Sequence, residues 1–523
     1  TGLRRLTGPG WAGIVRRIEQ RKGDGDMERD VPEQFDLCVI GCGPGGFAAA
    51  MRALDLGRHV CIVEAGEIGG AGVMWGALAS KTMWELAKDF DIAGKVDRGY
   101  RASGLTVDYE AMRRTVMGAV KEKQYQMLSQ IETFSPTRWP GPGSLTLIRG
   151  RAAFDGPDRV TVTGADGGRR PVVADHYLVA TGSRPRQFPG FPADQTEILD
   201  SDGILGLRRF PRRLMIIGAG VIGCEYATIF ANFGQTEVFL VDHQDGVIPY
   251  EDDDVSRFVS GSLTDKGVRI IHSAHLKDVT RRDDHLDVVL DFADGHAEVV
   301  EVETVLVSIG RVPNLSGLAV ERAGLIPGER GHLISDPTGR VAPNIWAVGD
   351  VTPHPALVNI AEKEGRYAVT AMFGEPGYPP NYDTMSTIMF FRPAVAAVGL
   401  NEKACQRRGI PYRVARFPNA LVNRAIAMRA LTGFVKIIVS DDDTGTILGM
   451  RAAGPQVSST IVSIAHLMDG GHGVEDVLKL VYPHPTISES IQECLRLLLG
   501  KSLYKPQAFP DHIAIRRWPG EEA

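Results

Sequence analysis

A glycine-rich motif that occurs twice is the feature that most constrains the fold of this chain. The segment FDLCVIGCGPGGFAAAMRALDLGRHVCIVEA (35–65) has the pattern of a strand, a G-x-G-x-x-G turn, an alanine-rich helix and a second strand that Glu64 closes. The segment LMIIGAGVIGCEYATIFANFGQTEVFLVD (214–242) repeats this order and closes with Asp242. Such a unit binds one dinucleotide. The sequence therefore predicts an α/β protein with two Rossmann-like domains.

The three glycines of each turn have separate roles. The first permits the tight turn, the second lets the backbone approach a pyrophosphate, and the third allows close packing of the helix. The N-terminus of the helix stabilises the phosphate charge. A purely structural glycine-rich turn is the alternative. The glycines expected to contact the dinucleotides are Gly41, Gly43, Gly46, Gly218, Gly220 and Gly223.

The acid that closes each unit is expected to bind a ribose. An acidic residue accepts hydrogen bonds from a free 2′-hydroxyl, whereas a 2′-phosphate requires arginine. The residues after Asp242, HQDGVIP (243–249), contain neither Arg nor Lys. The second unit is therefore expected to favour NADH, with NADPH as the alternative.

Three shorter fragments follow apolar strands further along the chain: ATGSRP (180–185), GRVPN (310–314) and NIWAVGD (344–350). Each one alone is consistent with an ordinary turn at a strand end. Asp350 stands just past its strand, where a carboxylate can meet a sugar-like chain or the edge of a flavin. The candidate binding residues in these fragments are Thr181, Gly182, Gly310, Gly349 and Asp350.

Composition excludes several other classes of function. The chain has 523 residues, six cysteines and a formal net charge of −6. The charge gives no reason to expect nucleic acid as a partner, and no apolar run is long enough to span a bilayer. The cysteines form no CxxC pair, and no metal-ligand spacing is present, so we expect a reduced, cytoplasmic setting without a metal. The arginine-rich segment 1–26 is either a targeting segment or an upstream extension before Met27.

Together these motifs resemble those of the pyridine nucleotide–disulfide oxidoreductase family, which includes dihydrolipoamide dehydrogenase and soluble pyridine nucleotide transhydrogenase. The resemblance covers about 33–505 and is also carried by GFVKI (433–437) and HPTISE (484–489). It implies FAD in the first unit, with Glu64 on the adenosine ribose and Asp350 near the ribityl chain. It implies NAD(P) in the second unit, which delivers hydride to the flavin.

The resemblance also implies a division into domains and a homodimer. We expect a flexible N-terminal extension at 1–32, a FAD-binding domain at 33–190 and 315–385, an NAD(P)-binding domain at 191–314, and a C-terminal α+β interface domain at 386–523. Within the last domain, SDDDTGTILGMRAAG (440–454) predicts a hairpin with a DTG turn. Helical patterns follow at 456–470 and 487–499.

The redox segment departs from the family. The family carries GGTCLNVGCIPSK, whereas this chain has GGAGVMWGALASK at 69–81, with Gly72 and Ala77 at the two cysteine positions. Reduction of lipoamide, glutathione or thioredoxin requires thiolate attack and disulfide exchange. That chemistry is missing from this segment, so a plain dihydrolipoamide dehydrogenase is not expected.

Other parts of the family's site are retained. Lys81 and Glu225 match its ion pair beside the flavin N5, where a lysine can stabilise negative charge. Trp75 lies in W-G-x-x-x-S-K, a pattern similar to that of soluble transhydrogenases, although packing in the core explains it equally well. His484 and Glu489 match a proton acceptor and the glutamate that orients it across the dimer interface. A capping box from Thr486 to Glu489 is the alternative reading.

The sequence therefore predicts an FAD-dependent NAD(P)H oxidoreductase that passes hydride from NADH to FAD and then directly to an acceptor that is not a disulfide. A second nicotinamide is the preferred acceptor, as in transhydrogenases. A quinone or a protein carrier would make the protein a diaphorase. A flavin-binding scaffold without turnover is the third alternative, although the retained Lys81, Glu225, Asp242 and Asp350 argue against it.

Overall fold

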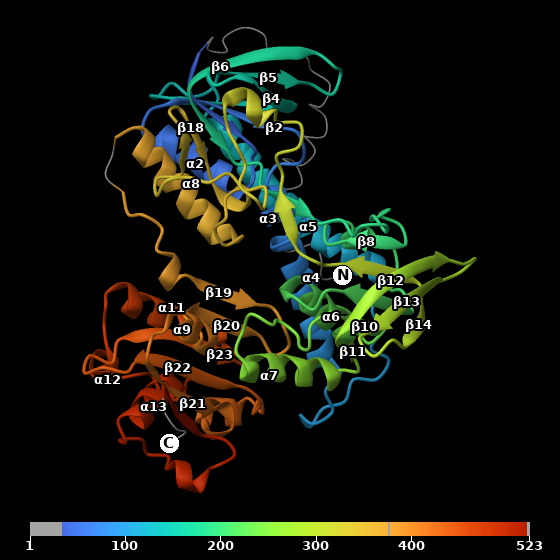
Figure 1. The fold of residues 1–523 in the computed structure, drawn as a ribbon, viewed down its shortest axis with the longest axis vertical. Coiled ribbons are helices and arrows are strands. Elements are labelled where there is room, and N and C mark those ends of the chain that lie inside the picture. Colours follow the sequence, from blue (N-terminus) through green and yellow to red (C-terminus); the bar gives the residue numbers. More distant parts are fainter. Residues whose placement is uncertain (1–33, 375–376, 520–523) are drawn as a thin grey trace.

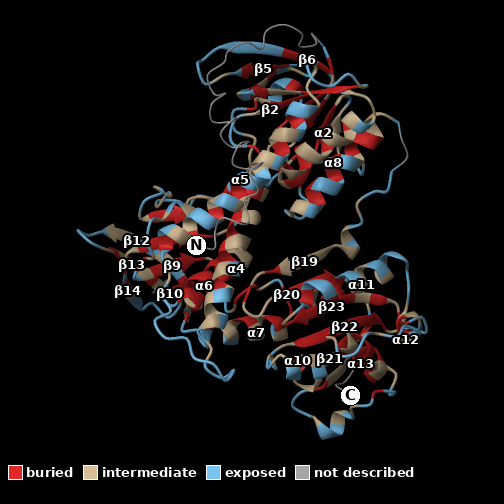
Figure 2. Ribbon diagram, turned by 180° about the vertical axis from the view of Figure 1, so that it is seen from behind, coloured by how far each residue is buried: buried red, intermediate tan, exposed pale blue. Residues whose placement is uncertain are grey.

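The computed structural model describes residues 34–374 and 377–519. The predicted N-terminal extension lies outside these residues. Three large sheets with their covering helices form most of the described chain, and they lie at three corners of an open arrangement (Figure 1); a three-stranded and a two-stranded sheet are smaller. Buried residues gather in the strands of these sheets and on the helix faces that pack against them (Figure 2). No helix in the described part of the chain is long and apolar enough to cross a membrane.

The first sheet has a parallel centre that two helices cover. Its strands, in spatial order, are β17 (Arg340–Ala342), β18 (Ile345–Ala347), β6 (Arg169–Val179), β1 (Phe35–Ile40), β2 (His59–Glu64) and β3 (Ser144–Arg149). The strands β4 (Arg151–Gly156) and β5 (Arg159–Thr163) extend β6 as an antiparallel ribbon. The helices are α2 (Pro44–Asp55) and α8 (Val358–Met372), which pack together. Their close approach depends on Gly365, because a β-carbon there would lie 2.3 Å from the Gly45 carbonyl oxygen.

The second sheet is entirely parallel. In spatial order its strands are β11 (Arg269–Ile271), β10 (Glu237–Val241), β9 (Arg213–Ile217), β15 (Thr304–Val307) and β8 (Ile198–Asp200). The helices α6 (Val221–Phe233) and α7 (Asp253–Thr264) belong to this unit, and so does an antiparallel meander of β12 (Ala274–Arg281), β13 (Leu286–Phe292) and β14 (Ala297–Val302). After its first residue, each central strand is apolar, because both faces of a parallel sheet are covered.

The chain leaves the first sheet after β6 and returns to it at β17. At the crossing, β7 (Ser183–Pro185) pairs antiparallel with β16 (Arg311–Pro313). The predicted boundaries after 190 and 314 fall in the connections beyond this pair, and the division into domains stays a prediction. A second link between the two sheets is formed by α3 (Gly70–Met74), α4 (Leu78–Ala93) and α5 (Tyr109–Thr133). Because α4 packs against both α5 and α6, side chains on α4 can reach residues of the second unit.

The third sheet is antiparallel. In spatial order its strands are β19 (Ser386–Met389), β20 (Val395–Gly399), β23 (Ile447–Ala453), β22 (Phe434–Ser440), β21 (Tyr412–Pro418) and β24 (Ala514–Trp518). The helices of this unit are α9 (Glu402–Arg408), α10 (Asn423–Ala427), α11 (Val457–Asp469), α12 (Val474–Leu478) and α13 (Glu489–Leu498). The predicted hairpin forms between β22 and β23, and the two predicted helices appear as α11 and α13. The predicted α/β fold class with a C-terminal α+β unit is thus confirmed.

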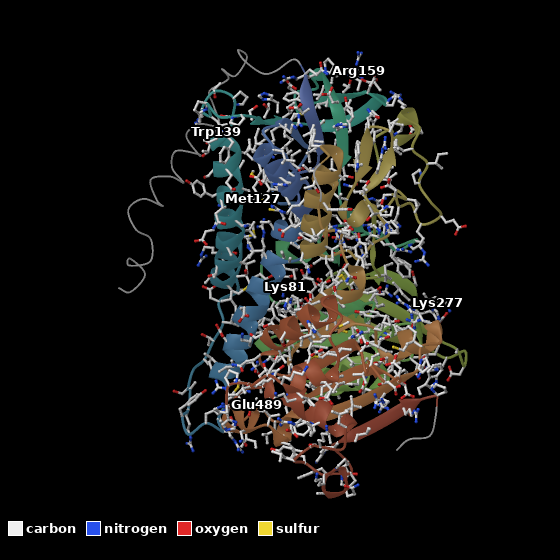
Figure 3. All side chains as sticks on the ribbon, turned by 90° about the vertical axis from the view of Figure 1, so that its left-hand side faces the viewer. Lys81, Met127, Trp139, Arg159, Lys277 and Glu489 are labelled. Atoms are coloured by element: carbon white, nitrogen blue, oxygen red, sulfur yellow. The ribbon has the colours of Figure 1, made fainter. Side chains whose placement is uncertain are left out.

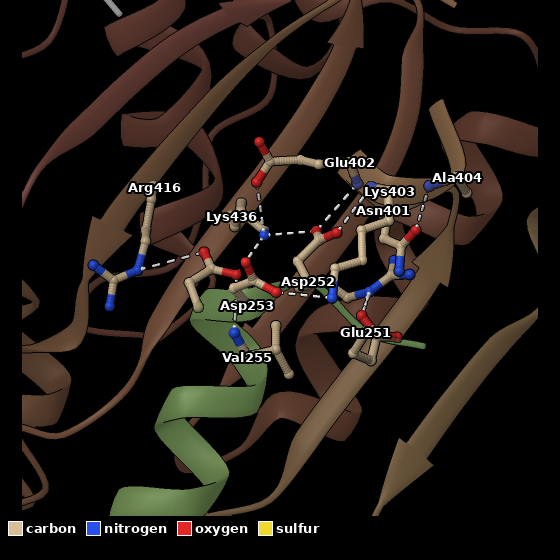
Figure 4. A network of polar contacts seen from close by, with 12 residues as sticks. Glu251, Asp252, Asp253, Val255, Asn401, Glu402, Lys403, Ala404, Arg416 and Lys436 are labelled. Atoms are coloured by element: carbon tan, nitrogen blue, oxygen red, sulfur yellow. Dashed lines mark hydrogen bonds and ion pairs between the residues drawn. The ribbon is translucent and has the colours of Figure 1, made fainter. Parts of the chain in front are cut away.

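Alternation along β22 directs one charged side chain away from the apolar helices. Val435, Ile437 and Val439 belong to the core that α11 and α13 share, so Lys436 points to the opposite face, which the second unit covers. There the fully buried Lys436 ammonium contacts three carboxylates, at 2.7 Å from Asp252, 2.6 Å from Asp254 and 3.0 Å from Glu402 (Figure 4).

A second buried ion pair lies nearby, with Arg451 Nε of β23 at 2.8 Å from Glu251 Oε2. Acidic residues at the start of α7 therefore form buried ion pairs with basic residues of the third sheet. These contacts hold the second unit and the third sheet together.

Candidate functional site

The two glycine turns have the geometry of anion-binding sites. Gly41 and Gly218 have φ angles of +105° and +102°, which favour glycine. A β-carbon at Gly43 or Gly220 would meet no atom within 4 Å, so open space faces both turns. No side chain of the described residues caps α2 or α6, and neither helix has an acid in its first turn. The open space and uncapped helix starts fit a dinucleotide pyrophosphate at each turn.

The third glycine of each turn is required by close packing. A β-carbon on Gly46 would lie 2.0 Å from the Gly41 carbonyl oxygen, and one on Gly223 would lie equally close to the Gly218 carbonyl oxygen. Both helices can therefore begin directly against their turns. The role predicted for the third glycine matches this geometry.

The acids at the ends of β2 and β10 make matching contacts. Glu64 accepts hydrogen bonds from the backbone N–H groups of Cys42 and Gly66, both at 2.7 Å. Asp242 accepts from Ala219 N–H at 2.6 Å and from Gln244 N–H at 2.9 Å. Each carboxylate therefore braces its glycine turn. Each also stands beside that turn, where a bound ribose is expected.

Lys81 and Glu225 form the predicted pair. Lys81 Nζ on α4 lies 2.7 Å from Glu225 Oε2 on α6, and it also donates to the Gly76 carbonyl oxygen at 3.2 Å. The Glu225 residue is only 6% exposed, whereas about a quarter of the Lys81 side chain remains accessible. Lys81 lies in the middle of the molecule, close to the meeting of the three units (Figure 3). The structure thus joins two helices from different units through one accessible ammonium group.

Phe390 completes this pair and was missed by the sequence analysis. Its backbone N–H donates to Glu225 Oε1 at 2.9 Å, and its ring centroid lies 5.1 Å from Lys81 Nζ. Trp84 packs edge-on against the same ring at 5.2 Å and donates its indole N–H to the Phe391 carbonyl oxygen. The third sheet therefore helps to orient the ion pair. Nothing in the apolar segment around Phe390 indicates this contact.

The two positions at which the family resemblance predicts cysteines are occupied by Gly72 and Ala77. Gly72 lies within α3 and Ala77 immediately precedes α4. A β-carbon on Gly72 would fall 2.5 Å from Pro44 Cγ and 3.1 Å from Val358 Cγ2, so this position is closely packed. Trp75, at the end of α3, is partly buried against the main apolar core, in agreement with the packing explanation.

The six cysteines are all buried free thiols: Cys38, Cys42, Cys61, Cys224, Cys405 and Cys494. Cys38 and Cys61 face each other across β1 and β2, and they share a core with Phe154 and Tyr177. The helices α2, α3 and α4 pack on the core formed by the opposite face of the sheet. Burial, aided by the charge of Glu64, raises the pKa of Cys42 to about 12. All six thiols are buried and none forms a disulfide, so the described chain shows no paired sulfurs beside Lys81.

The predicted turns after β6, β15 and β18 come together around the β7–β16 crossing. Asn314 N–H donates to the Gly182 carbonyl oxygen at 2.9 Å, and Arg186 N–H donates to the Gly310 carbonyl oxygen at 3.0 Å. Asp350 accepts from Ser183 Oγ at 2.5 Å. The buried Thr181 hydroxyl has no hydrogen-bond partner among the described residues. An unpaired buried hydroxyl beside open glycine turns fits a bound polar group.

Glu364 fixes the turn that presents Asp350. This buried carboxylate accepts from Gly349 N–H at 2.7 Å, from His354 Nδ1 at 2.8 Å and from the Tyr382 hydroxyl at 2.6 Å. No sequence pattern indicates Glu364, His354 or Tyr382, because each belongs to a segment with no recognisable motif.

His484 and Glu489 are paired, but far from Lys81 within one chain. Figure 3 shows Glu489 well separated from Lys81. His484 Nδ1 lies 2.7 Å from Glu489 Oε1, and the His484 side chain is 60% exposed. Only half of the predicted capping box forms. Glu489 accepts from Thr486 N–H at 2.8 Å, but the helix begins at Glu489 and the Thr486 hydroxyl donates to the Pro483 carbonyl oxygen instead. The glutamate therefore orients the histidine and also braces the turn before α13.

Comparisons with known proteins agree with this geometry. The family model described as pyridine nucleotide-disulphide oxidoreductase matches residues 35–365, and the dimerisation domain of that family matches 385–495. Dihydrolipoyl dehydrogenase of Geobacillus stearothermophilus is 31% identical over 477 residues, which cover 91% of this chain and 98% of that protein. The enzyme of the same name from Halobacterium salinarum is 32% identical over 478 residues, with coverages of 91% and 98%.

Solved structures show the same similarity. The crystal structure of LpdA from Mycobacterium tuberculosis has a TM-score of 0.79 at 29% identity, covering 88% of this chain and 99% of that chain. The Cu(II) complex of the HOCl-induced flavoprotein disulfide reductase RclA from Escherichia coli has a TM-score of 0.78 at 25% identity, covering 89% and 99%. The similarity therefore extends through all three sheets.

Proposed function

This chain belongs to the pyridine nucleotide-disulphide oxidoreductase family, and we propose that it is an FAD-dependent NADH oxidoreductase whose final electron acceptor is not a disulfide. Membership of the family carries with it the binding of FAD and NAD(H). When bound, FAD supplies the chemistry of accepting hydride from a nicotinamide and giving electrons to a second acceptor.

One observation carries the choice of acceptor. Gly72 and Ala77 stand where the family has its redox cysteines, while the Lys81–Glu225 pair is formed at 2.7 Å. Disulfide substrates are reduced through a mixed disulfide with a protein thiolate. A chain that keeps the charged pair but lacks both thiols retains the residues that act beside the flavin and loses those that reduce a disulfide. The retained residues suffice for the exchange of electrons between a nicotinamide and an acceptor that needs no thiol.

Different residues are proposed for the two dinucleotides. The turn at Gly41–Gly46, Glu64, Thr181 and Asp350 would hold FAD, and the turn at Gly218–Gly223 with Asp242 would hold NAD(H). The Lys81 ammonium can stabilise negative charge that develops beside it, and Glu225 balances this charge when the site is at rest. Lys81 and Glu225 therefore act by orientation and charge.

A second nicotinamide is the preferred acceptor, which would make the protein similar to a soluble transhydrogenase. The W-G-x-x-x-S-K pattern around Trp75 supports this preference. The relatives named dihydrolipoyl dehydrogenase do not extend that activity to this chain, because the thiols it requires are absent from the segment 69–81. A quinone or protein acceptor is the second candidate, favoured by the partial exposure of Lys81.

We also propose that two chains pair through the third sheet and its helices. The dimerisation model matches this region, and the exposed apolar side chains of Val462, Val481 and Leu503 lie on it. His484 is exposed in the same region, where a second chain could bring it near another molecule's Lys81.

The proposal predicts a specific order of electron acceptors. FAD-loaded protein is reduced anaerobically with NADH, freed of nucleotide, and mixed in separate stopped-flow experiments with thio-NADP⁺, a short-chain quinone or lipoamide. We expect thio-NADP⁺ to reoxidise the protein fastest and lipoamide to have no effect, because no thiolate is available for exchange. A Cys38→Ala/Cys61→Ala variant should behave identically, because that pair lies on the far face of the first sheet.

Each other outcome has a distinct meaning. Reoxidation by the quinone alone would identify a diaphorase. Failure of NADH to bleach the bound flavin would leave only the scaffold alternative. Rapid lipoamide turnover would contradict the absence of a thiol relay.

A further inference from the structure

We propose that the segment from Tyr382 to Phe390 is a strut that fixes the distance between the two ends of the FAD site, with Tyr382 and Phe390 as positioning residues. This inference rests on the proposed function only in placing FAD between Asp350 and Lys81. The strut comprises Tyr382, the strand β19 and Phe390, and it belongs to the edge of the third sheet.

One end of the strut lies under the turn that presents Asp350. The Tyr382 hydroxyl donates to Glu364 Oε1 at 2.6 Å, and the other oxygen of Glu364 accepts from Gly349 N–H at 2.7 Å. The Tyr382 ring also lies 4.5 Å from the His354 ring, between centroids. Gly349 has a φ of +71°, so its turn is of a kind that needs support. Glu364 is therefore the link through which Tyr382 holds the residue next to Asp350.

The hydroxyl of Tyr382 acts as a hydrogen-bond donor to the Glu364 carboxylate. Burial and the adjacent Glu364 raise the pKa of Tyr382 well above its ordinary value, so the hydroxyl keeps its proton and donates it. A buried carboxylate that loses one donor carries a large desolvation penalty. Removal of the Tyr382 hydroxyl should therefore disturb the Glu364 side chain, whereas the aromatic ring at position 382 should stay in place.

The other end of the strut meets the ion pair. Phe390 follows β19 directly, donates its N–H to Glu225 at 2.9 Å and lies beside the Lys81 ammonium. A hydrogen bond to one oxygen of Glu225 leaves the other oxygen directed at Lys81. Phe390 therefore orients the Glu225 carboxylate, and Glu225 in turn positions Lys81.

The segment between these ends is tied to the third sheet. β19 pairs antiparallel with β20 from Ser386 to Met389. Beside Tyr382, Asn381 Nδ2 and Thr384 Oγ1 donate to Asp469 Oδ1 of α11 at 3.1 Å and 3.3 Å. A paired strand held at both ends transmits a displacement because its length is fixed. The third sheet thus contributes to the flavin site of its own chain.

The test uses Tyr382→Phe and Phe390→Leu, separately and together, in the FAD-loaded protein. Tyr382→Phe keeps the ring and removes the donor, while Phe390→Leu keeps the backbone N–H and removes the aromatic face. Two quantities are measured for each variant: the dissociation constant of FAD, from reconstitution of the apoprotein, and the rate of anaerobic flavin reduction by NADH. Tyr378→Phe is the matched control, because Tyr378 lies four residues before the strut and is 86% exposed.

We expect Tyr382→Phe to weaken FAD binding about tenfold, the loss of roughly one hydrogen bond to a charged group. Flavin reduction should slow in both single variants. In the double variant the two effects on that rate should not multiply, because one strut serves both ends. The melting temperature of Tyr382→Phe should fall by only a few degrees, about 4 °C, below that of Tyr378→Phe, because the penalty is confined to one buried carboxylate.

Three results would overturn the strut. The first is multiplication of the two rate effects, which would show independent ends. The second is a lower melting temperature with unchanged FAD affinity and rate, which would make Tyr382 a packing residue only. The third is FAD affinity in Tyr382→Phe equal to that of Tyr378→Phe. A wild-type protein that NADH does not reduce would instead contradict the proposed function, and the FAD affinity would still decide the role of Tyr382.

Discussion

Replacement of Lys81 with methionine should slow the reduction of bound flavin by NADH about 10²–10³-fold, the usual cost of removing one preorganised charged group. Methionine keeps the length and the apolar stem of lysine but removes the ammonium that lies 2.7 Å from Glu225. Glu225 would then be buried with only the Phe390 N–H as its remaining hydrogen-bond donor. The rate is measured anaerobically from the loss of flavin absorbance in a stopped-flow instrument.

Lys277→Met is the matched control for this variant. Lys277 lies in the second unit, away from Lys81 (Figure 3). Its side chain is 58% exposed and its ion pair among the described residues is with Asp291, so its loss should leave the rate unchanged. FAD should remain bound in both variants, because the glycine turn, Glu64 and Asp350 are untouched. Release of FAD from Lys81→Met, or a rate equal to that of Lys277→Met, would contradict the role proposed for Lys81.

Replacement of Lys436 with methionine should cost about 3–5 kcal/mol of stability, because it removes the central cation from three buried carboxylates. Burial opposes the charge of Lys436, but the attraction of Asp254, Asp252 and Glu402 outweighs burial and raises the pKa of the lysine. Among the described residues, the cations that would still pair with these three carboxylates in the variant are Arg516, at 2.6 Å from Glu402, and Arg416, at 4.0 Å from Asp254. The loss is measured from the midpoint of urea unfolding and from the melting temperature.

The penalty in Lys436→Met should depend on pH. In the wild type, burial opposes ionisation of Asp252, but Lys436 lowers its pKa, so this carboxylate stabilises the protein above its unfolded pKa of about 4. Without the lysine, burial and the neighbouring carboxylates oppose the charge of Asp252, so the pKa of Asp252 should rise above its unfolded value. The variant should then be least stable at neutral and alkaline pH. It should regain stability relative to the wild type as the pH falls toward about 5.

Lys403→Met separates this effect from the general loss of a lysine. Lys403 lies beside the same cluster and pairs at 2.8 Å with Asp253, but both of these side chains are accessible to solvent. Its replacement should cost less than about 1 kcal/mol. Equal stabilities of the two variants would show that the buried network contributes nothing to the joint between the second unit and the third sheet.

Local patterns predicted the parts of the site that depend on local structure. The glycine turns, Glu64 and Asp242 lie within continuous strand–turn–helix segments, so their spacing fixes their geometry. The Lys81–Glu225 pair was predicted only through the resemblance to the family, since α4 and α6 are far apart in sequence. The half-formed capping box shows that a short motif can be present without its full hydrogen bonding.

Long-range contacts could not be predicted in this way. Phe390 orients Glu225 through its backbone N–H, which every residue except proline carries, so no residue type marks that hydrogen bond. Its ring beside Lys81 is a separate contact that depends on the packing of distant segments. Glu364 and Tyr382 come from a helix and from the segment before β19, and each alone has the pattern of a surface residue. Lys436 follows ordinary strand alternation, and its three carboxylates come from distant segments. These residues were found only from the packing of the three units.

The number of NADH molecules that each bound FAD consumes tests direct transfer most simply. Anaerobic titration of the FAD-loaded protein should reach complete loss of flavin absorbance at one NADH per FAD, because the described site offers no second electron-pair store beside Lys81. A requirement for two NADH molecules per FAD would show that a disulfide is also reduced, and it would contradict electron transfer without a thiol relay.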